Sequence, residues 1–334
     1  MKETRYQDAI GVVAPPIRQA LLGVPLQRRD LVEEIRLRAG GPVVLVCADG
    51  IFLVNGCGQV ITCQEDVPLV CSYECLEQTF RAVCGYSVHT HQREIVKGFI
   101  TLKGGHRVGI AGTMVERDGV ITSVKEISSL NIRVAKEWKE TATQIPKEAL
   151  WGGLLLVGPP GCGKTTMLRD VARIISGSVY APGRKVTVLD ERGELAAMWD
   201  GTPQNDIGIN TDVLNGFSKV VGMEIALRSL SPQVIVCDEI GSREEANGLF
   251  HCVNAGAEII ASVHGKNQEE LYAKPWVMEL LRRGVFEHIV FLQVEANQRT
   301  VRVVKTKDWL YEMDGHDSDF PNPCSCGGKA KERV

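Results

Sequence analysis

Long apolar runs and an excess of one charge are both missing from this 334-residue chain. No apolar stretch approaches the roughly 18 residues that a membrane-spanning helix needs. The first eight residues contain no apolar core, so they are not expected to act as a signal peptide. Lys and Arg total 38 against 41 Asp and Glu, a balance that provides no global basic field for coating nucleic acid. These absences predict a cytoplasmic globular protein.

Aromatic residues and a regular cysteine pattern are also scarce. Aromatics make up 6% of the chain, and no stretch interleaves them with basic residues as base-stacking platforms would. The 11 cysteines are scattered, and neither Cys71, Cys75 and Cys84 nor Cys324 and Cys326 have spacings that complete a four-ligand zinc set. Most are therefore interpreted as reduced thiols that pack like small apolar residues, with a metal site as the alternative.

The most informative feature that is present is a glycine-rich loop between an apolar run and a helical pattern. The run at 153–157 predicts a buried strand, and residues 167–175 carry apolar side chains at helical spacing. Glycines let successive N–H groups point at phosphate oxygens, and the N-terminus of the next helix adds a positive field. A plain glycine turn would not require Gly163, Lys164 and Thr165 in that order. The sequence predicts a nucleoside triphosphate site.

Each residue type in this loop has a predicted role. Lys164 can reach the β- and γ-phosphates, and the Thr165 hydroxyl can bind Mg²⁺. ATP and Mg²⁺ are therefore the expected ligands. The predicted nucleotide-binding residues are Gly158, Pro159, Pro160, Gly161, Cys162, Gly163, Lys164, Thr165 and Thr166.

Acidic residues that could complete the site follow other apolar runs. Asp238 and Glu239 end the run at 234–237; Asp238 is placed to bind Mg²⁺, and Glu239 to polarise the attacking water. The alternative is that both merely cap the next helix. The run at 186–189 ends in a group of acids that includes Glu191 and Glu194, and the run at 259–263 ends in His264. Open α/β sheets place their ligands at such strand ends.

The strand and helix patterns predict two domains and a tail. Residues 1–145 alternate short strand patterns with helical ones, including a helical pattern at 72–84, which indicates an α+β module. The polar segment 136–146 contains a proline and is predicted to be the linker. In 146–313, strand patterns alternate with longer helical segments, which favours a mostly parallel sheet covered by helices. Residues 314–334 are polar and predicted to be disordered.

Four motifs in order resemble those of the secretion and type IV pilus ATPases. They are the phosphate loop at 158–166, an acidic "Asp box" at 190–194, a Walker B block at 227–244 and a "His box" at 256–264. The resemblance implies a RecA-like P-loop NTPase core of the AAA-type ATPase class and assigns catalytic roles to Glu239, Glu191, Glu194 and His264. The sequence departs from the family pattern in that Asp238 precedes Glu239, where the pilus enzymes mostly carry glycine.

Over residues 25–305 the chain resembles a sporulation family, the stage III AA proteins of endospore-forming bacteria. The segments that carry this resemblance are 33–38, 104–112, 129–134 and 280–286. It implies a Mg-dependent ATPase on the mother-cell side, peripheral to the membrane, that powers a secretion-like channel into the forespore. The implied partners are further copies of the chain in a ring, expected to be a hexamer, and a membrane-embedded channel or assembly protein. Arg107 and Arg133 are the implied catalytic arginines, acting in cis or in trans.

Two other functions fit the same loop. A nucleic-acid-dependent translocase or RNA-binding regulator could use Arg36, Arg38 and Arg282 as part of a basic channel, although the low aromatic content argues against nucleic acid as a partner. A small-molecule kinase would need an acceptor pocket, whereas an acid directly after the magnesium aspartate favours hydrolysis. Release of phosphate without an acceptor would distinguish a hydrolase from a kinase.

Overall fold

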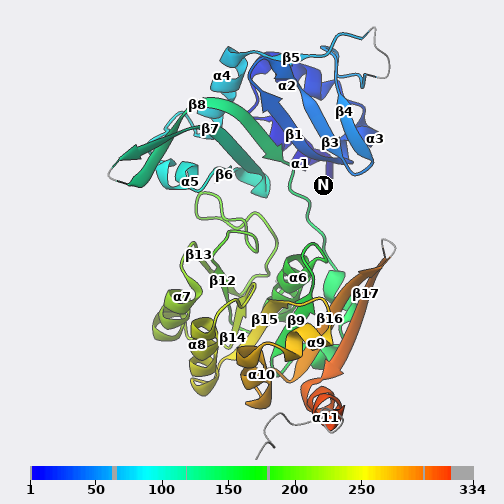
Figure 1. The fold of residues 1–334 in the computed structure, drawn as a ribbon, viewed down its shortest axis with the longest axis vertical. Coiled ribbons are helices and arrows are strands. Elements are labelled where there is room, and N and C mark those ends of the chain that lie inside the picture. Colours follow the sequence, from blue (N-terminus) through cyan, green and yellow to red (C-terminus); the bar gives the residue numbers. More distant parts are fainter. Residues whose placement is uncertain (1, 62–65, 118, 179–180, 296–297, 317–334) are drawn as a thin grey trace, which may run out of the picture. The chain divides into compact units, whose positions relative to one another are not determined.

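The chain folds into two compact units (Figure 1). A computed structural model describes residues 2–61, 66–117, 119–178, 181–295 and 298–316. Unit 1 contains residues 1–138 and 196–206, and unit 2 contains residues 139–195 and 207–334. Within the described ranges, no helix has the length and apolar character needed to cross a membrane.

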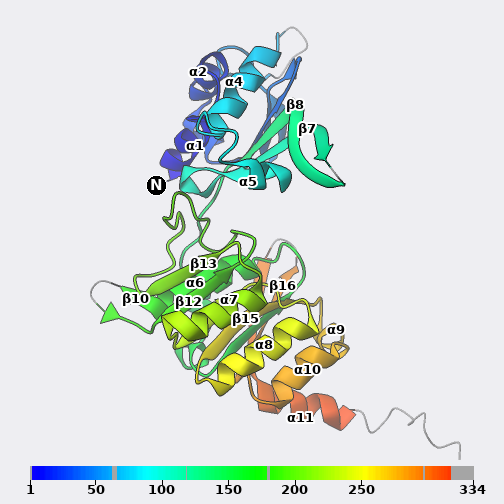
Figure 2. The same cartoon turned by 90° about the vertical axis from the view of Figure 1, so that its left-hand side faces the viewer.

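Unit 1 is built on a six-stranded antiparallel sheet in the order β4-β3-β1-β8-β7-β6. Its strands are β1 Val32–Arg38, β3 Val44–Cys47, β4 Gly50–Leu53, β6 Phe99–Thr101, β7 Arg107–Arg117 and β8 Val120–Arg133, with β2 Gly41–Pro42 and β5 Val70–Cys71 forming a separate pair. Its helices are α1 Lys2–Ile10, α2 Pro15–Leu22, α3 Leu26–Arg29, α4 Tyr73–Val83 and α5 Gln92–Val96. Helices α1, α2 and α4 lie on one face of this sheet (Figure 2).

Buried and partly exposed side chains alternate along β1, which explains why helices cover only one face of the sheet. Ile35 and Leu37 are fully buried under the helices, whereas Arg36 points to the other face. Helix α4 begins after Ser72, whose hydroxyl accepts a hydrogen bond from the Cys75 N–H at 3.2 Å and so caps the helix. The helical prediction for 72–84 is confirmed, and the helix-covered face forms the core of unit 1.

Unit 2 is a seven-stranded sheet in the order β13-β12-β14-β15-β9-β16-β17, parallel except for the last pair. The strands are β9 Leu154–Gly158, β12 Val186–Asp190, β13 Thr211–Asn215, β14 Val234–Cys237, β15 Glu258–His264, β16 His288–Glu295 and β17 Gln298–Lys305, with β10 Gly177–Ser178 and β11 Ala181–Pro182 as a separate pair. The helices are α6 Lys164–Ser176, α7 Lys219–Ile225, α8 Arg243–Asn254, α9 Gln268–Tyr272, α10 Pro275–Arg282 and α11 Thr306–His316. The predicted mostly parallel sheet is confirmed.

Two apolar cores lie on the two faces of this sheet. Leu154 and Leu156 of β9 pack with α6, and Leu155 and Val157 pack with the core that contains α8, α10 and Trp309. Because both faces of the central strands are buried, their sequences are continuously apolar rather than alternating. Figure 2 shows the sheet between its helical layers. This arrangement directs the polar strand ends to one edge.

Several sequence expectations differ from the structure at element boundaries. The predicted domain boundary at 145/146 lies inside unit 2, because the chain leaves unit 1 after Trp138 and returns to it for residues 196–206. That returning segment is held inside unit 1 by Gln204, whose Oε1 accepts from the Gly104 N–H at 2.7 Å.

Three residues of the segment predicted to be disordered, 314–316, belong to a helix. Helix α11 continues to His316, and Asp314 Oδ1 lies 3.0 Å from Arg282 Nη2 of helix α10. Residues 317–334, with Cys324 and Cys326, lie outside the described residues. Elsewhere, no group of three or more His, Cys, Asp or Glu side chains is arranged to hold a metal ion among the residues that the structure describes.

Candidate functional site

The ends of four adjacent parallel strands meet at one edge of the unit 2 sheet. Strand β9 leads into the glycine loop, β12 ends at Asp190, β14 is followed by Asp238, and β15 ends at His264. The register pairs His264 directly with Gly158, so the histidine lies beside the start of the loop. Since the strands are parallel, their carboxyl ends face the same side, which is where open α/β sheets bind ligands.

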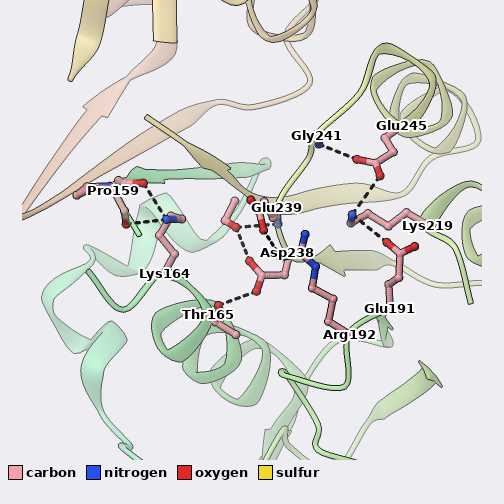
Figure 3. Close-up of polar contacts among 12 residues, drawn as sticks. Pro159, Lys164, Thr165, Glu191, Arg192, Lys219, Asp238, Glu239, Gly241 and Glu245 are labelled. Atoms are coloured by element: carbon pink, nitrogen blue, oxygen red, sulfur yellow. Dashed lines mark hydrogen bonds and ion pairs between the residues drawn. The ribbon is translucent and has the colours of Figure 1, made fainter. Parts of the chain in front are cut away.

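The glycine loop has the backbone that phosphate binding needs. Gly161 and Gly163 adopt φ of +74° and +92°, a region that side chains other than glycine rarely tolerate. Gly163 is the N-cap of the 13-residue helix α6, and Lys164 and Thr165 occupy its first turn. Lys164 Nζ donates to the carbonyl oxygens of Gly158 at 2.8 Å and Pro159 at 2.9 Å (Figure 3). Its ammonium group is thus held over the loop.

The predicted magnesium residues lie next to one another. The Thr165 hydroxyl donates to Asp238 Oδ2 at 2.6 Å, and Ser262 Oγ of β15 donates to the other carboxylate oxygen, Oδ1 (Figure 3). A hydroxyl and a carboxylate are the hard oxygen donors that Mg²⁺ prefers. These two side chains therefore fit the ion that their sequence motif implies.

Glu239 adopts an unusual backbone conformation directly after Asp238. Its φ is +49°, in the left-handed region, which is uncommon for a residue other than glycine and is concentrated at functional sites. Its N–H donates to Ser262 Oγ at 2.9 Å, and the Ile240 N–H donates to the Ser262 carbonyl at 2.8 Å. Strand β15 thereby holds the turn that orients the Glu239 carboxylate.

That carboxylate forms an ion pair with Arg192. Arg192 Nη1 lies 2.6 Å from Glu239 Oε2, although both side chains are substantially exposed (Figure 3). An exposed ion pair contributes little to stability. Its consequence is geometric, because it connects the acidic loop after β12 to the glutamate after β14.

Asp190 organises the acidic loop. It is buried, and its Oδ1 accepts from the N–H groups of Glu194 at 2.8 Å and Leu195 at 3.1 Å. Arg169 of helix α6 donates to the carbonyl oxygens of the same two residues, each at 2.7 Å. The helix that begins at the phosphate loop therefore also holds the loop that carries Glu194.

A nearly buried lysine connects Glu191 to the turn at 238–241 that follows β14, here called the Walker B turn. Lys219 Nζ lies 3.2 Å from Glu191 Oε2 and 3.1 Å from Glu245 Oε1, and Glu245 Oε2 accepts from the Gly241 N–H at 2.7 Å (Figure 3). Burial lowers the pKa of Lys219, but the hydrogen bonds and charges of Glu245 and Glu191 outweigh it, so the net pKa is raised. In this structure Glu191 is thus part of an ion-pair cluster.

Replacing Lys219 with Met should destabilise the protein by about 2 kcal/mol, because two partly buried carboxylates lose their shared cation. We expect the loss as a lower thermal unfolding midpoint at pH 7. The raised pKa means that the parent chain keeps this contribution below the unfolded lysine pKa of about 10.4 and loses it as the pH rises through the folded value. The variant should therefore lose less stability than the parent above that pH.

The matched control is Lys185→Met. Lys185 is exposed just before β12, at the opposite end of that strand from the acidic loop. A surface substitution of this kind should change stability by no more than about 0.5 kcal/mol. Equal unfolding midpoints for the two methionine variants would show that the Lys219 cluster does not stabilise the fold.

The structure does not place all the predicted site residues in one unit. The loop residues, Asp238, Glu239, Glu191, Glu194 and His264 all belong to unit 2, whereas Arg107 and Arg133 belong to unit 1. Arg107 of β7 and Arg133 of β8 stand directly opposite each other in the antiparallel pairing of the two strands. Arg133 Nε is 3.7 Å from Glu34 Oε2, and the Arg107 guanidinium lies 4.7 Å from the centre of the Phe99 ring.

Four side chains with clear positions in the site were not singled out from the sequence. Arg192 and Ser262 lie inside motifs whose other residues drew attention, so their motifs were a usable signal. Lys219 and Glu245 carry no local pattern that distinguishes them from ordinary helix-terminal charges. Their role depends on contacts between segments far apart in the chain.

Comparisons with solved structures support the observed fold. The ATPase DotB of Legionella pneumophila superposes with a TM-score of 0.54 at 16% identity, covering 86% of this chain and 81% of that one. The pilus retraction motor PilT, solved with bound ADP, gives 0.56 at 13% identity, covering 87% and 88%. At these identities the likeness shows a shared RecA-like P-loop fold.

Sequence comparisons are more specific. Stage III sporulation protein AA of Bacillus subtilis (strain 168) is 32% identical over 301 residues, which cover 89% of this chain and 94% of the relative. The sequence profile of the family described as "Sporulation stage III, protein AA" matches residues 3–309. The match therefore includes both units and every predicted site residue. The chain belongs to the sporulation stage III protein AA family.

Proposed function

We propose that this protein is a Mg-dependent ATPase that works as a ring-shaped motor on a sporulation-specific secretion channel. The observation that carries the proposal is the convergence of Lys164, Thr165, Asp238 and Glu239 at one edge of a parallel sheet. The fold is shared with DotB, an ATPase, and with PilT, a motor solved with ADP. The channel between mother cell and forespore, the hexamer and the cytoplasmic, mother-cell side are inferred from the family.

The residues divide the reaction between them. The loop amides and Lys164 would bind the phosphates, and Thr165 and Asp238 would hold Mg²⁺, which supplies charge neutralisation at the phosphate oxygens. Glu239 would accept a proton from the attacking water, since its carboxylate is exposed on a turn held by Ser262. Glu194 follows β12 and His264 ends β15, the two strands that flank β14, and from there they would contact the water or the terminal phosphate.

Glu191 is expected to act indirectly. Its carboxylate contacts Lys219, which also contacts Glu245 beside the Walker B turn. Arg107 and Arg133 would neutralise charge on the terminal phosphate as it leaves, in the manner of arginine fingers. Unit 1, to which both arginines belong, would move when ATP is hydrolysed. This movement would perform the motor's work.

The test is phosphate release by the full-length chain, with MgATP and no acceptor, combined with sizing in MgATPγS. We expect Mg-dependent release of phosphate and a nucleotide-dependent ring. Single-stranded DNA or RNA should not stimulate the activity, whereas strong stimulation with steep salt dependence would favour a nucleic-acid translocase. Absence of nucleotide binding would overturn the proposal.

A further inference from the structure

An arginine outside every recognised motif lies on the phosphate loop. Arg299 is the second residue of β17, opposite Val294 of β16. Strand β16 runs parallel to β9 and packs against the start of the loop, since a Cβ added to Gly158 would lie 2.8 Å from the Leu292 carbonyl oxygen. The hairpin of β16 and β17 therefore borders the loop.

The Arg299 guanidinium occupies the space next to the Cα of Gly163. A Cβ built on Gly163 would lie 2.2 Å from Arg299 Nη2 and 2.7 Å from its Cζ. Gly163 is the N-cap of α6 and directly precedes Lys164. A second cation is thus in contact with the backbone that forms the predicted phosphate cradle.

The surroundings of Arg299 suggest what this cation is for. The side chain is exposed, and no carboxylate lies within ion-pair distance of it among the side chains that the structure describes. A glycine backbone offers a guanidinium no compensating charge. An anion held by the loop amides would offer one, and a guanidinium binds phosphate oxygens through charge-assisted hydrogen bonds.

We propose that Arg299 is a nucleotide-binding residue that contacts the phosphates common to ADP and ATP. This inference rests on the proposed function. In such a loop the backbone cradles the α- and β-phosphates, and the lysine, here Lys164, reaches the β- and γ-phosphates. A group lying over Gly163 is therefore placed for the α- and β-phosphates. Arg299 would strengthen binding of both nucleotides without discriminating between them.

The experiment measures the affinity of the full-length chain for MgADP and MgATPγS by calorimetry. Arg299→Ala should weaken both about tenfold or more, since losing a hydrogen bond to a charged group costs about 1.5–3 kcal/mol. The affinity should also become less sensitive to salt. Arg299→Lys should restore part of the affinity because it keeps the charge. Circular dichroism would verify that each variant is folded.

Arg302→Ala is the matched control. Arg302 is an exposed arginine on the same strand, paired with Phe291, and its substitution should leave both affinities unchanged. Unchanged or tighter binding by Arg299→Ala would overturn the inference, and so would a loss confined to MgATPγS. If the parent chain binds neither nucleotide, the proposed function fails as well. If it binds both and Arg299→Ala matches it, only this inference fails.

Discussion

A Glu239→Gln variant is expected to bind MgATP as tightly as the parent chain and to hydrolyse it about a hundredfold more slowly or worse. The amide keeps the size of the side chain but cannot accept a proton from water. The turn itself should persist, because Ser262 holds it through the Glu239 backbone N–H and the Ile240 N–H. Single-turnover phosphate release and nucleotide affinity together measure the effect.

Sizing provides a second measurement on the same variant. Slow hydrolysis should trap the nucleotide-bound oligomer, so the ring should persist in MgATP longer than that of the parent chain. Glu224→Gln is the control, because Glu224 is an exposed glutamate of α7 that pairs with Arg228 on the helix surface. Parent-like hydrolysis by Glu239→Gln would remove Glu239 from its assigned role.

A Lys164→Ala variant should fail at the earlier step. Lys164 Nζ contacts the loop carbonyls of Gly158 and Pro159, a position from which it can turn to phosphate oxygens. Loss of its charge-assisted hydrogen bonds should weaken MgATP binding roughly ten- to hundredfold, and hydrolysis at low ATP should fall accordingly. Equilibrium titration with MgATPγS would measure the change.

The control for Lys164→Ala is Lys185→Ala, which removes an exposed lysine at the far end of β12. It should bind MgATPγS like the parent chain. An affinity of Lys164→Ala equal to that of the control would contradict the phosphate-cradle argument. The two variants of the site therefore separate binding from hydrolysis, since Lys164→Ala changes the first and Glu239→Gln the second.

Local sequence patterns predicted the elements that carry the site. The loop between β9 and α6 was predictable because the required glycines, the lysine and the threonine all lie within the short segment 158–165. The strands β12, β14 and β15 were predictable because burial on both faces demands continuous apolar runs. The polar residue that ends each run then marked the edge of the sheet. Arg107 and Arg133 remain predictions as catalytic residues.

The division into units was harder to predict. A proline and a polar composition placed the linker at 136–146, but residues 139–195 pack with unit 2. Segment 196–206 belongs to unit 1 through contacts such as that of Gln204 with Gly104. No hydrophobic periodicity in the segment indicates which unit it packs with. Whether a loop returns to an earlier unit depends on its contacts with residues far away in the sequence.

The sequence alone determined that a phosphate loop opens a helix and that Asp238 and Glu239 follow a buried strand, because these features depend on neighbours in the chain. Only the tertiary structure decided that Arg192 pairs with Glu239, that Lys219 joins Glu191 to Glu245, and that Arg299 lies on Gly163. The strand order β13-β12-β14-β15-β9-β16-β17 brings these residues together across long separations in sequence. The partner of a charged side chain depends on which segments pack together, and a local sequence pattern does not contain that information.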